Sequence, residues 1–115
     1  MASQLMVDLY GCDKETLNSL ERLREIARQT IHDIHSEIVE ECVHEFEPYG
    51  ITYIAVITTS HFSIHTWPEN DYAAVDIFSC DEDVPDQIVE RLTQTFGAKK
   101  NHVTKYERDI GEKGE

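Results

Sequence analysis

The fold is decided by residues 51–80, which read ITYIAVITTSHFSIHTWPENDYAAVDIFSC. Segment 62–67 alternates apolar and polar residues, which is typical of a strand with one buried face. Segment 51–58 is almost continuously apolar, as expected of a central strand that is covered on both faces or at a dimer contact. Segment 72–80 indicates another strand, and only short turns connect the three segments. Because connections of this length join antiparallel neighbours, the stretch predicts the middle of an antiparallel sheet.

Further strands are predicted on both sides of this stretch. Segment 4–10 has apolar residues on one parity, and segment 101–106 indicates a last strand. Segment 38–46 is rich in β-branched residues but carries glutamates, so we expect a strand with one solvated face. Residues 48–50, Pro-Tyr-Gly, predict the turn that follows it. Residues 109–115 are expected to form a frayed acidic tail.

Two amphipathic helices complete the pattern. Asp13 can cap a first helix in which apolar residues recur every three or four positions, and we expect that helix to end near Ser36. A second helix is predicted over 84–96 and closes at Gly97. The order β-α-β-β-β-β-α-β indicates an α+β fold, a two-layer α/β sandwich in which an antiparallel sheet carries two helices on one face. With only two helices to cover the sheet, part of it is expected to be buried in an oligomer.

Composition limits the classes of function. The chain has 115 residues, a mass of 13.3 kDa and 40% hydrophobic residues, which predicts a single domain over 1–115. Ten Lys and Arg against 23 Asp and Glu give a formal net charge of −13. That charge repels phosphate backbones and anionic membrane surfaces, so we expect no nucleic-acid or membrane partner. It is compatible with a cationic substrate, although solubility alone explains it.

The sequence also predicts a cytoplasmic location. No stretch approaches the ~20 apolar residues of a membrane span, and residues 1–10 lack the pattern of a signal peptide. Cys12, Cys42 and Cys80 form neither an even set nor a CxxC pair, which favours free thiols in a reducing compartment. Cys12 and Cys42 are interpreted as packing residues.

The densest polar cluster lies at 58–69, and three kinds of chemistry compete for it. A metal site would use His61 and His65, but four residues of strand span ~13 Å, too far for two ligands of one ion without a sharp bend; we predict no metal. A serine hydrolase would use Ser60, His65 and Asp76, but the G-x-S-x-G elbow is absent. In the third, a serine in a tight turn attacks the preceding carbonyl and forms an ester. Elimination from the ester gives dehydroalanine, which hydrolyses to a pyruvoyl group. The pyruvoyl ketone then binds an amine as a Schiff base. Spacing alone does not choose among them.

A resemblance favours the third chemistry. The run 60–69, SHFSIHTWPE, followed by YAAVDIFSC at 72–80, resembles the prokaryotic S-adenosylmethionine decarboxylase proenzyme. The similarity extends to FEPYG at 46–50 and LYGCD at 9–13, and so covers essentially the whole chain. It implies a pyruvoyl-dependent decarboxylase of S-adenosylmethionine that supplies the aminopropyl donor for polyamine synthesis, and that works as a homodimer with sites near the interface.

The resemblance also implies roles for single residues. Ser60 matches the precursor of the pyruvoyl group, so self-cleavage at Thr59–Ser60 is expected to give chains 1–59 and 60–115. His65 matches the histidine that assists processing by removing the serine Cα proton. Thr52 occupies the position of a hydroxyl residue that also assists processing. Cys80 matches the acid that protonates the substrate carbon. The remaining matches concern substrate binding: the adenine ring stacks on Phe46 and Trp67, and Glu69 contacts the ribose hydroxyls.

One position departs from the family pattern. The family typically has glutamate before the cleavage serine, whereas this chain has Thr59. The chemistry uses only the backbone carbonyl of that residue, so threonine permits cleavage. The departure keeps open a related pyruvoyl-dependent decarboxylase of arginine or ornithine. A separate alternative is an unprocessed regulatory homologue, against which the intact Ser60, His65 and Cys80 argue.

Overall fold

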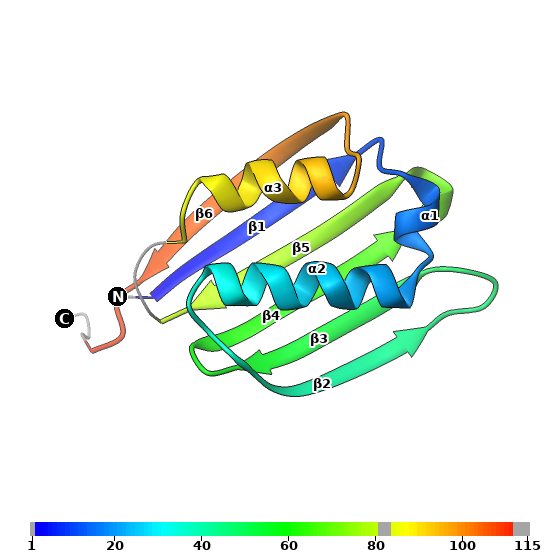
Figure 1. Cartoon of the computed structure of the whole chain (residues 1–115). Helices are drawn as coiled ribbons and strands as arrows, with labels where there is room; N and C mark the ends of the chain where they lie inside the picture. The colour runs from blue at the N-terminus through cyan, green and yellow to red at the C-terminus, as the bar shows by residue number, and fades with distance from the viewer. Residues whose placement is uncertain (1, 81–83, 112–115) are drawn as a thin grey trace.

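One six-stranded sheet forms the frame of the molecule. The structure is a computed structural model that describes residues 2–80 and 84–111. The strands stand in the order β2-β3-β4-β5-β1-β6, and each neighbouring pair is antiparallel. Their bounds are β1 Ala2–Tyr10, β2 Ile38–Glu45, β3 Ile51–Ile57, β4 Ser60–Trp67, β5 Tyr72–Ser79 and β6 Lys100–Arg108. The predicted meander of β3, β4 and β5 is confirmed, and so is the two-layer sandwich: α2 and α3 lie on one face of the sheet (Figure 1).

The first helix differs from the prediction, because two helices replace one. Helix α1 covers Lys14–Leu17, with Asp13 accepting the Thr16 backbone N–H as predicted. The chain then breaks, and Ser19 caps a second helix, α2 (Leu20–Asp33), by accepting from the Arg22 backbone N–H at 3.1 Å. Apolar spacing continues through the break, so only this second cap marks it. Helix α2 ends at Asp33 rather than near Ser36, because His35 turns the chain away with a φ of 62°.

The core fills the space between the helices and one face of the sheet. Alternate residues of β3 and β4 point into it, among them Tyr53, Phe62 and Ile64, each with no exposed surface. Phe96, which follows α3 (Gln87–Thr95), closes the core beside Leu92. The alternation that predicts one buried face for 62–67 is therefore confirmed.

In the described parts of the chain, no helix lies on the opposite face of the sheet. Ile54 and Val56 of β3 point to this open face and are 41% and 47% exposed. Of the two explanations offered for the apolar run at 51–58, cover on both faces within one chain is thus wrong. Strand β2 is an edge strand whose residues are largely exposed on both faces, and Cys42 is exposed there rather than packed.

The expected acidic tail begins just after β6. Residues 109–111 form no strand or helix, and 112–115 of the expected acidic tail lie outside the described residues. Within 2–80 and 84–111, no helix is long and apolar enough to cross a membrane.

Candidate active site

A strained serine begins β4, directly after the turn from β3. Ile57 pairs with Ser60, so Thr58 and Thr59 alone make the connection. Two-residue hairpin turns commonly place positive φ at the turn residues, which β-branched threonines resist. Here neither threonine has a positive φ, and the unusual angle falls on Ser60, with φ 150°. A non-glycine residue in this region costs about 1–3 kcal/mol and persists only where the surroundings hold it.

The carbonyl before Ser60 accepts a strong hydrogen bond. The Cys80 backbone N–H donates to the Thr59 carbonyl oxygen at 2.8 Å. Ser60 also pairs with Ser79, so the predicted nucleophile and Cys80 lie at neighbouring ends of β4 and β5. The N–H polarises the carbonyl that Ser60 would attack, and it is aimed at the oxygen on which negative charge would develop.

A third group at this turn was not predicted. The Ser36 hydroxyl accepts from the Thr59 backbone N–H at 3.2 Å and from the Thr59 hydroxyl at 3.0 Å, and it lies 2.9 Å from the Thr58 hydroxyl. Ser36 is buried just beyond the end of α2. Nothing in the sequence marks this contact, because 23 residues separate Ser36 from Thr59.

The other predicted residues gather at the opposite end of β4. His65 and Thr52 face each other on β4 and β3, and the His65 Nδ1 lies 3.0 Å from the Thr52 hydroxyl. Both residues line a cavity of about 360 Å³. All the residues predicted to bind substrate line the same cavity: Phe46, Trp67 and Glu69.

Aromatic side chains surround this cavity. The Trp67 ring lies 6.2 Å from the His65 ring and 5.3 Å from the Tyr72 ring, measured between centroids. Trp67 and Phe46 remain 41% and 49% exposed, so large apolar faces are open to a ligand. Tyr49 also lines the cavity and was not predicted, although its place between Phe46 and Gly50 in the turn is a signal that could have indicated it.

Asp76 supplies a carboxyl group near His65 on the open face. It pairs with Ser63 on β4, two residues from His65. Desolvation raises the pKa of Asp76 above its ordinary value, while His65 and His61 oppose the shift. By contrast, burial raises the pKa of the Cys12 thiol to about 11, so Cys12 stays protonated and is a packing residue, as predicted.

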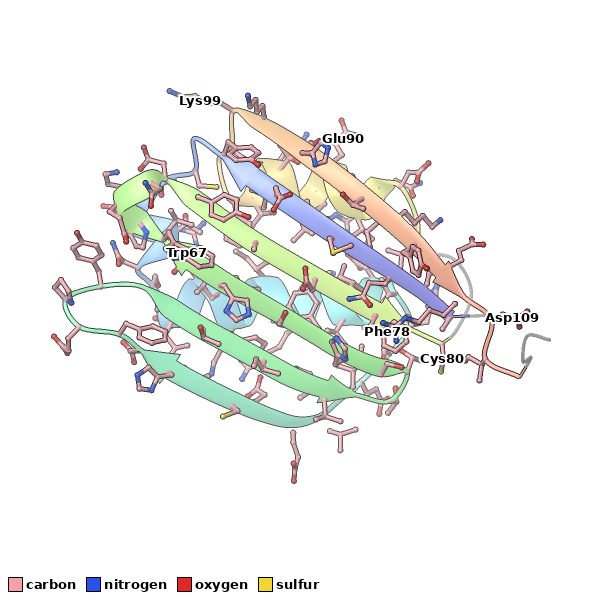
Figure 2. The ribbon with its side chains drawn as sticks, turned by 180° about the vertical axis from the view of Figure 1, so that it is seen from behind. Trp67, Phe78, Cys80, Glu90, Lys99 and Asp109 are labelled. Atoms are coloured by element: carbon pink, nitrogen blue, oxygen red, sulfur yellow. The ribbon has the colours of Figure 1, made fainter. Side chains whose placement is uncertain are left out.

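One chain does not bring its predicted site residues together. Ser60 and His65 lie five residues apart on the same strand, a separation of roughly 16 Å. Figure 2 shows Trp67 at one end of the sheet and Cys80 at the other. A serine hydrolase triad of Ser60, His65 and Asp76 is therefore not assembled. Among residues 2–80 and 84–111, no three His, Cys, Asp or Glu side chains cluster as a metal site.

Comparisons with known proteins identify relatives of the whole chain. The model of the S-adenosylmethionine decarboxylase family matches residues 3–109. An S-adenosylmethionine decarboxylase proenzyme of Thermotoga petrophila is 39% identical over 109 residues, which are 94% of this chain and 84% of the relative. One from Moorella thermoacetica is 40% identical over 111 residues, which are 96% and 89% of the two chains.

A solved structure shares the fold. The crystal structure of the adenosylmethionine decarboxylase from Aquifex aeolicus superimposes with a TM-score of 0.85 at 26% identity. The match covers 100% of this chain and 96% of that one. The arrangement of the sheet and helices is therefore that of a known decarboxylase along its full length.

Proposed function

The chain belongs to the S-adenosylmethionine decarboxylase family, and from that premise we propose that it cleaves itself at Thr59–Ser60 and then decarboxylates S-adenosylmethionine. The product is the aminopropyl donor for polyamine synthesis. The observation that carries the proposal is the strained Ser60 beside a Thr59 carbonyl that the Cys80 N–H polarises.

Self-cleavage follows from this turn. Ser60 Oγ attacks the Thr59 carbonyl carbon, the C–N bond breaks, and the hydroxyl proton passes to the freed amine, which leaves an ester. The Cys80 N–H stabilises the oxyanion on the Thr59 oxygen, and the move from amide to ester releases the backbone strain at Ser60. Loss of the Ser60 Cα proton then expels the Thr59 carboxylate. Water converts the remaining dehydroalanine into a pyruvoyl group, and ammonia leaves.

The residues of the chain have distinct roles in the reaction that follows. When formed, the pyruvoyl ketone supplies the electrophile that takes up the substrate amine and accepts electrons as carbon dioxide leaves. The Cys80 thiol, exposed at the end of β5, returns a proton to the substrate carbon. Phe46 and Trp67 stack on the adenine, and Glu69 accepts hydrogen bonds from the ribose hydroxyls. A cavity of about 360 Å³ is within the usual range for such a ligand.

We infer a homodimer because one chain holds Ser60 and His65 roughly 16 Å apart. We place a second copy against the open face, related by a two-fold axis that runs between the two sheets, parallel to them and perpendicular to the strands. This arrangement brings the His65 end of one chain over the Ser60 end of the other. Packed sheets lie ~10 Å apart, and side chains from the two facing surfaces meet in the space between them. The exposed Ile54 and Val56 supply apolar surface for this contact. The Thr52 hydroxyl lies 3.0 Å from His65 Nδ1. In the tautomer whose Nδ1–H donates to Thr52, Nε2 is free to remove the Cα proton.

The first experiment is denaturing mass spectrometry of the purified protein. We expect chains 1–59 and 60–115 whose masses sum to that of the intact chain plus one water minus one ammonia. Ser60→Ala should stay intact. An intact wild-type chain after long incubation contradicts self-cleavage. Release of carbon dioxide is then compared for S-adenosylmethionine, arginine and ornithine; faster release from either amino acid contradicts the substrate.

A mixing experiment tests the shared site. Ser60→Ala and His65→Ala chains each lack one group, but a hybrid dimer contains one complete site if His65 acts across the interface. Mixing after mild unfolding and refolding should therefore restore cleavage of the His65→Ala chain alone. Absence of cleavage in a hybrid shown to form contradicts the interchain role.

We also infer a cytoplasmic location. All three cysteines, Cys12, Cys42 and Cys80, are free thiols, which persist in a reducing compartment. The net charge of −13 supports a cationic small molecule rather than nucleic acid as the partner.

A further inference from the structure

We propose that Ser36 is a positioning residue for self-cleavage, which it assists by holding Thr59 through its backbone and its side chain at once. This inference rests on the proposed function. Its basis is the set of three contacts at the Ser36 hydroxyl, with the Thr59 N–H, the Thr59 hydroxyl and the Thr58 hydroxyl.

The hydrogen bonds assign each proton at Ser36. A serine hydroxyl has two acceptor sites and one donor. Both acceptor sites are filled by Thr59, whose N–H and hydroxyl donate at 3.2 Å and 3.0 Å. The Ser36 proton therefore goes to the Thr58 hydroxyl oxygen, 2.9 Å away, which also accepts from the Glu37 N–H. The donor and both acceptor sites of the Ser36 hydroxyl are therefore occupied, and all three partners belong to the turn before Ser60.

Ser36 itself is held by the end of α2. Its backbone N–H donates to the Ile31 carbonyl at 3.0 Å, and it follows the positive φ of His35. The Thr58 N–H in turn donates to the Glu37 carbonyl at 2.9 Å. The turn is therefore fastened to a helix that packs on the core, and it does not depend on its own two residues for rigidity.

The two bonds to the Thr59 backbone fix the residue whose carbonyl is attacked, one at the peptide before it and one at the peptide that is cut. Ser36 accepts from the Thr59 N–H, which belongs to the Thr58–Thr59 peptide, and the Cys80 N–H donates to the Thr59 carbonyl oxygen, which belongs to the Thr59–Ser60 peptide. The unfavourable φ of Ser60 persists only where several neighbouring contacts hold it. Loss of the Ser36 contact therefore lets the turn relax, and the Ser60 hydroxyl moves away from the Thr59 carbonyl carbon. A shift of 1 Å can cost about 100-fold in rate.

The same contact gives Thr59 a role of its own. Thr59 is the residue at which the chain departs from the family motif, and its hydroxyl is bonded to Ser36. The two residues therefore act as a pair. We expect Thr59→Val, which keeps the branched shape but lacks the hydroxyl, to lose part of what Ser36→Ala loses, and the double variant to be no slower than Ser36→Ala alone.

The test is the time course of self-cleavage, followed by denaturing mass spectrometry. We expect Ser36→Ala to slow cleavage about tenfold or more, and Ser36→Thr, which keeps the oxygen, to recover most of the rate. Ser19→Ala is the matched control: it removes a serine hydroxyl that holds a backbone N–H at the other end of α2, far from the turn, and should cleave like wild type. Once processed, Ser36→Ala should have wild-type kcat and KM per cleaved chain, which a general loss of structure would not preserve.

The outcomes separate the two proposals. If wild type cleaves and Ser36→Ala cleaves equally fast, or if Ser19→Ala is slowed as much as Ser36→Ala, the role of Ser36 is refuted and the proposed function stands. If wild type itself does not cleave, the proposed function fails and the role of Ser36 fails with it.

Discussion

Replacing Ser60 by glycine should stabilise the intact chain relative to alanine, against the usual order. Neither variant has the hydroxyl needed for cleavage, so both are compared as whole chains. The alanine keeps a Cβ at φ 150°, where a non-glycine residue costs about 1–3 kcal/mol. Glycine removes that cost but loses about 0.5–1 kcal/mol through its more flexible unfolded state. The free energy of unfolding should therefore be about 1 kcal/mol higher for Ser60→Gly, which corresponds to ~4 °C in Tm.

The assay is equilibrium unfolding in urea and thermal unfolding at one protein concentration, because association changes apparent stability. Ser63 provides the matched control: it lies on the same strand, is buried and has no positive φ. There alanine should be the more stable substitution by about 0.5–1 kcal/mol. If glycine is the less stable substitution at both positions, Ser60 is not strained, and release of strain does not assist its cleavage.

Three further predictions concern the reaction and the open face. Cys80→Ala retains the backbone N–H that donates to the Thr59 carbonyl, so this variant should still cleave itself, as mass spectrometry will show. Its release of carbon dioxide, measured in the activity assay, should fall about 10²–10⁴-fold because the acid is lost. Trp67→Ala should cleave normally but raise KM about tenfold or more, since aromatic stacking on a base contributes ~1–3 kcal/mol. Because the pKa of Asp76 is raised above its ordinary value of 3.8, its contribution to stability is present below that pH and is lost as pH rises. Asp76→Asn should therefore raise Tm more at about pH 7 than at about pH 4; an equal rise at both contradicts the shift.

Periodicity predicted the layers of this fold but missed a break. The apolar spacing that runs through α1 and α2 indicates which face of each helix packs on the core. The spacing is the same whether or not the helical backbone hydrogen bonds continue from one helix into the next. The chain breaks before α2 because Ser19 caps that helix. A serine at this position is equally compatible with the exposed face of one uninterrupted helix, so the sequence does not reveal the break. Similarly, the apolar run of β3 indicated cover on both faces, but periodicity does not state whether a second layer comes from the same chain or another. Ile54 and Val56 remain 41% and 47% exposed in this chain.

The motif nominates residues for the reaction but does not say where they lie in the fold. Phe46, Trp67 and Glu69 do share one cavity, as a family motif that binds one substrate requires. Ser60 and His65 stand only five positions apart in the sequence, which suggests direct contact. In an extended strand those positions lie roughly 16 Å apart, so nearness in sequence here means separation in space. In the homodimer proposed above, Ser60 of one chain meets His65 of the other.

One part of the site that sequence could not predict is made by the backbone. Cys80 illustrates the reason, because its two proposed roles use different atoms. The thiol is a property of cysteine and leaves a signature in the motif, whereas the N–H that holds the Thr59 carbonyl belongs to every residue except proline. Only the pairing of β4 with β5 brings that N–H to the turn, since Ser60 lies opposite Ser79. A shift of one residue in this pairing would move the N–H away and leave the motif intact in sequence. Strand register therefore determines whether the chain can cleave itself.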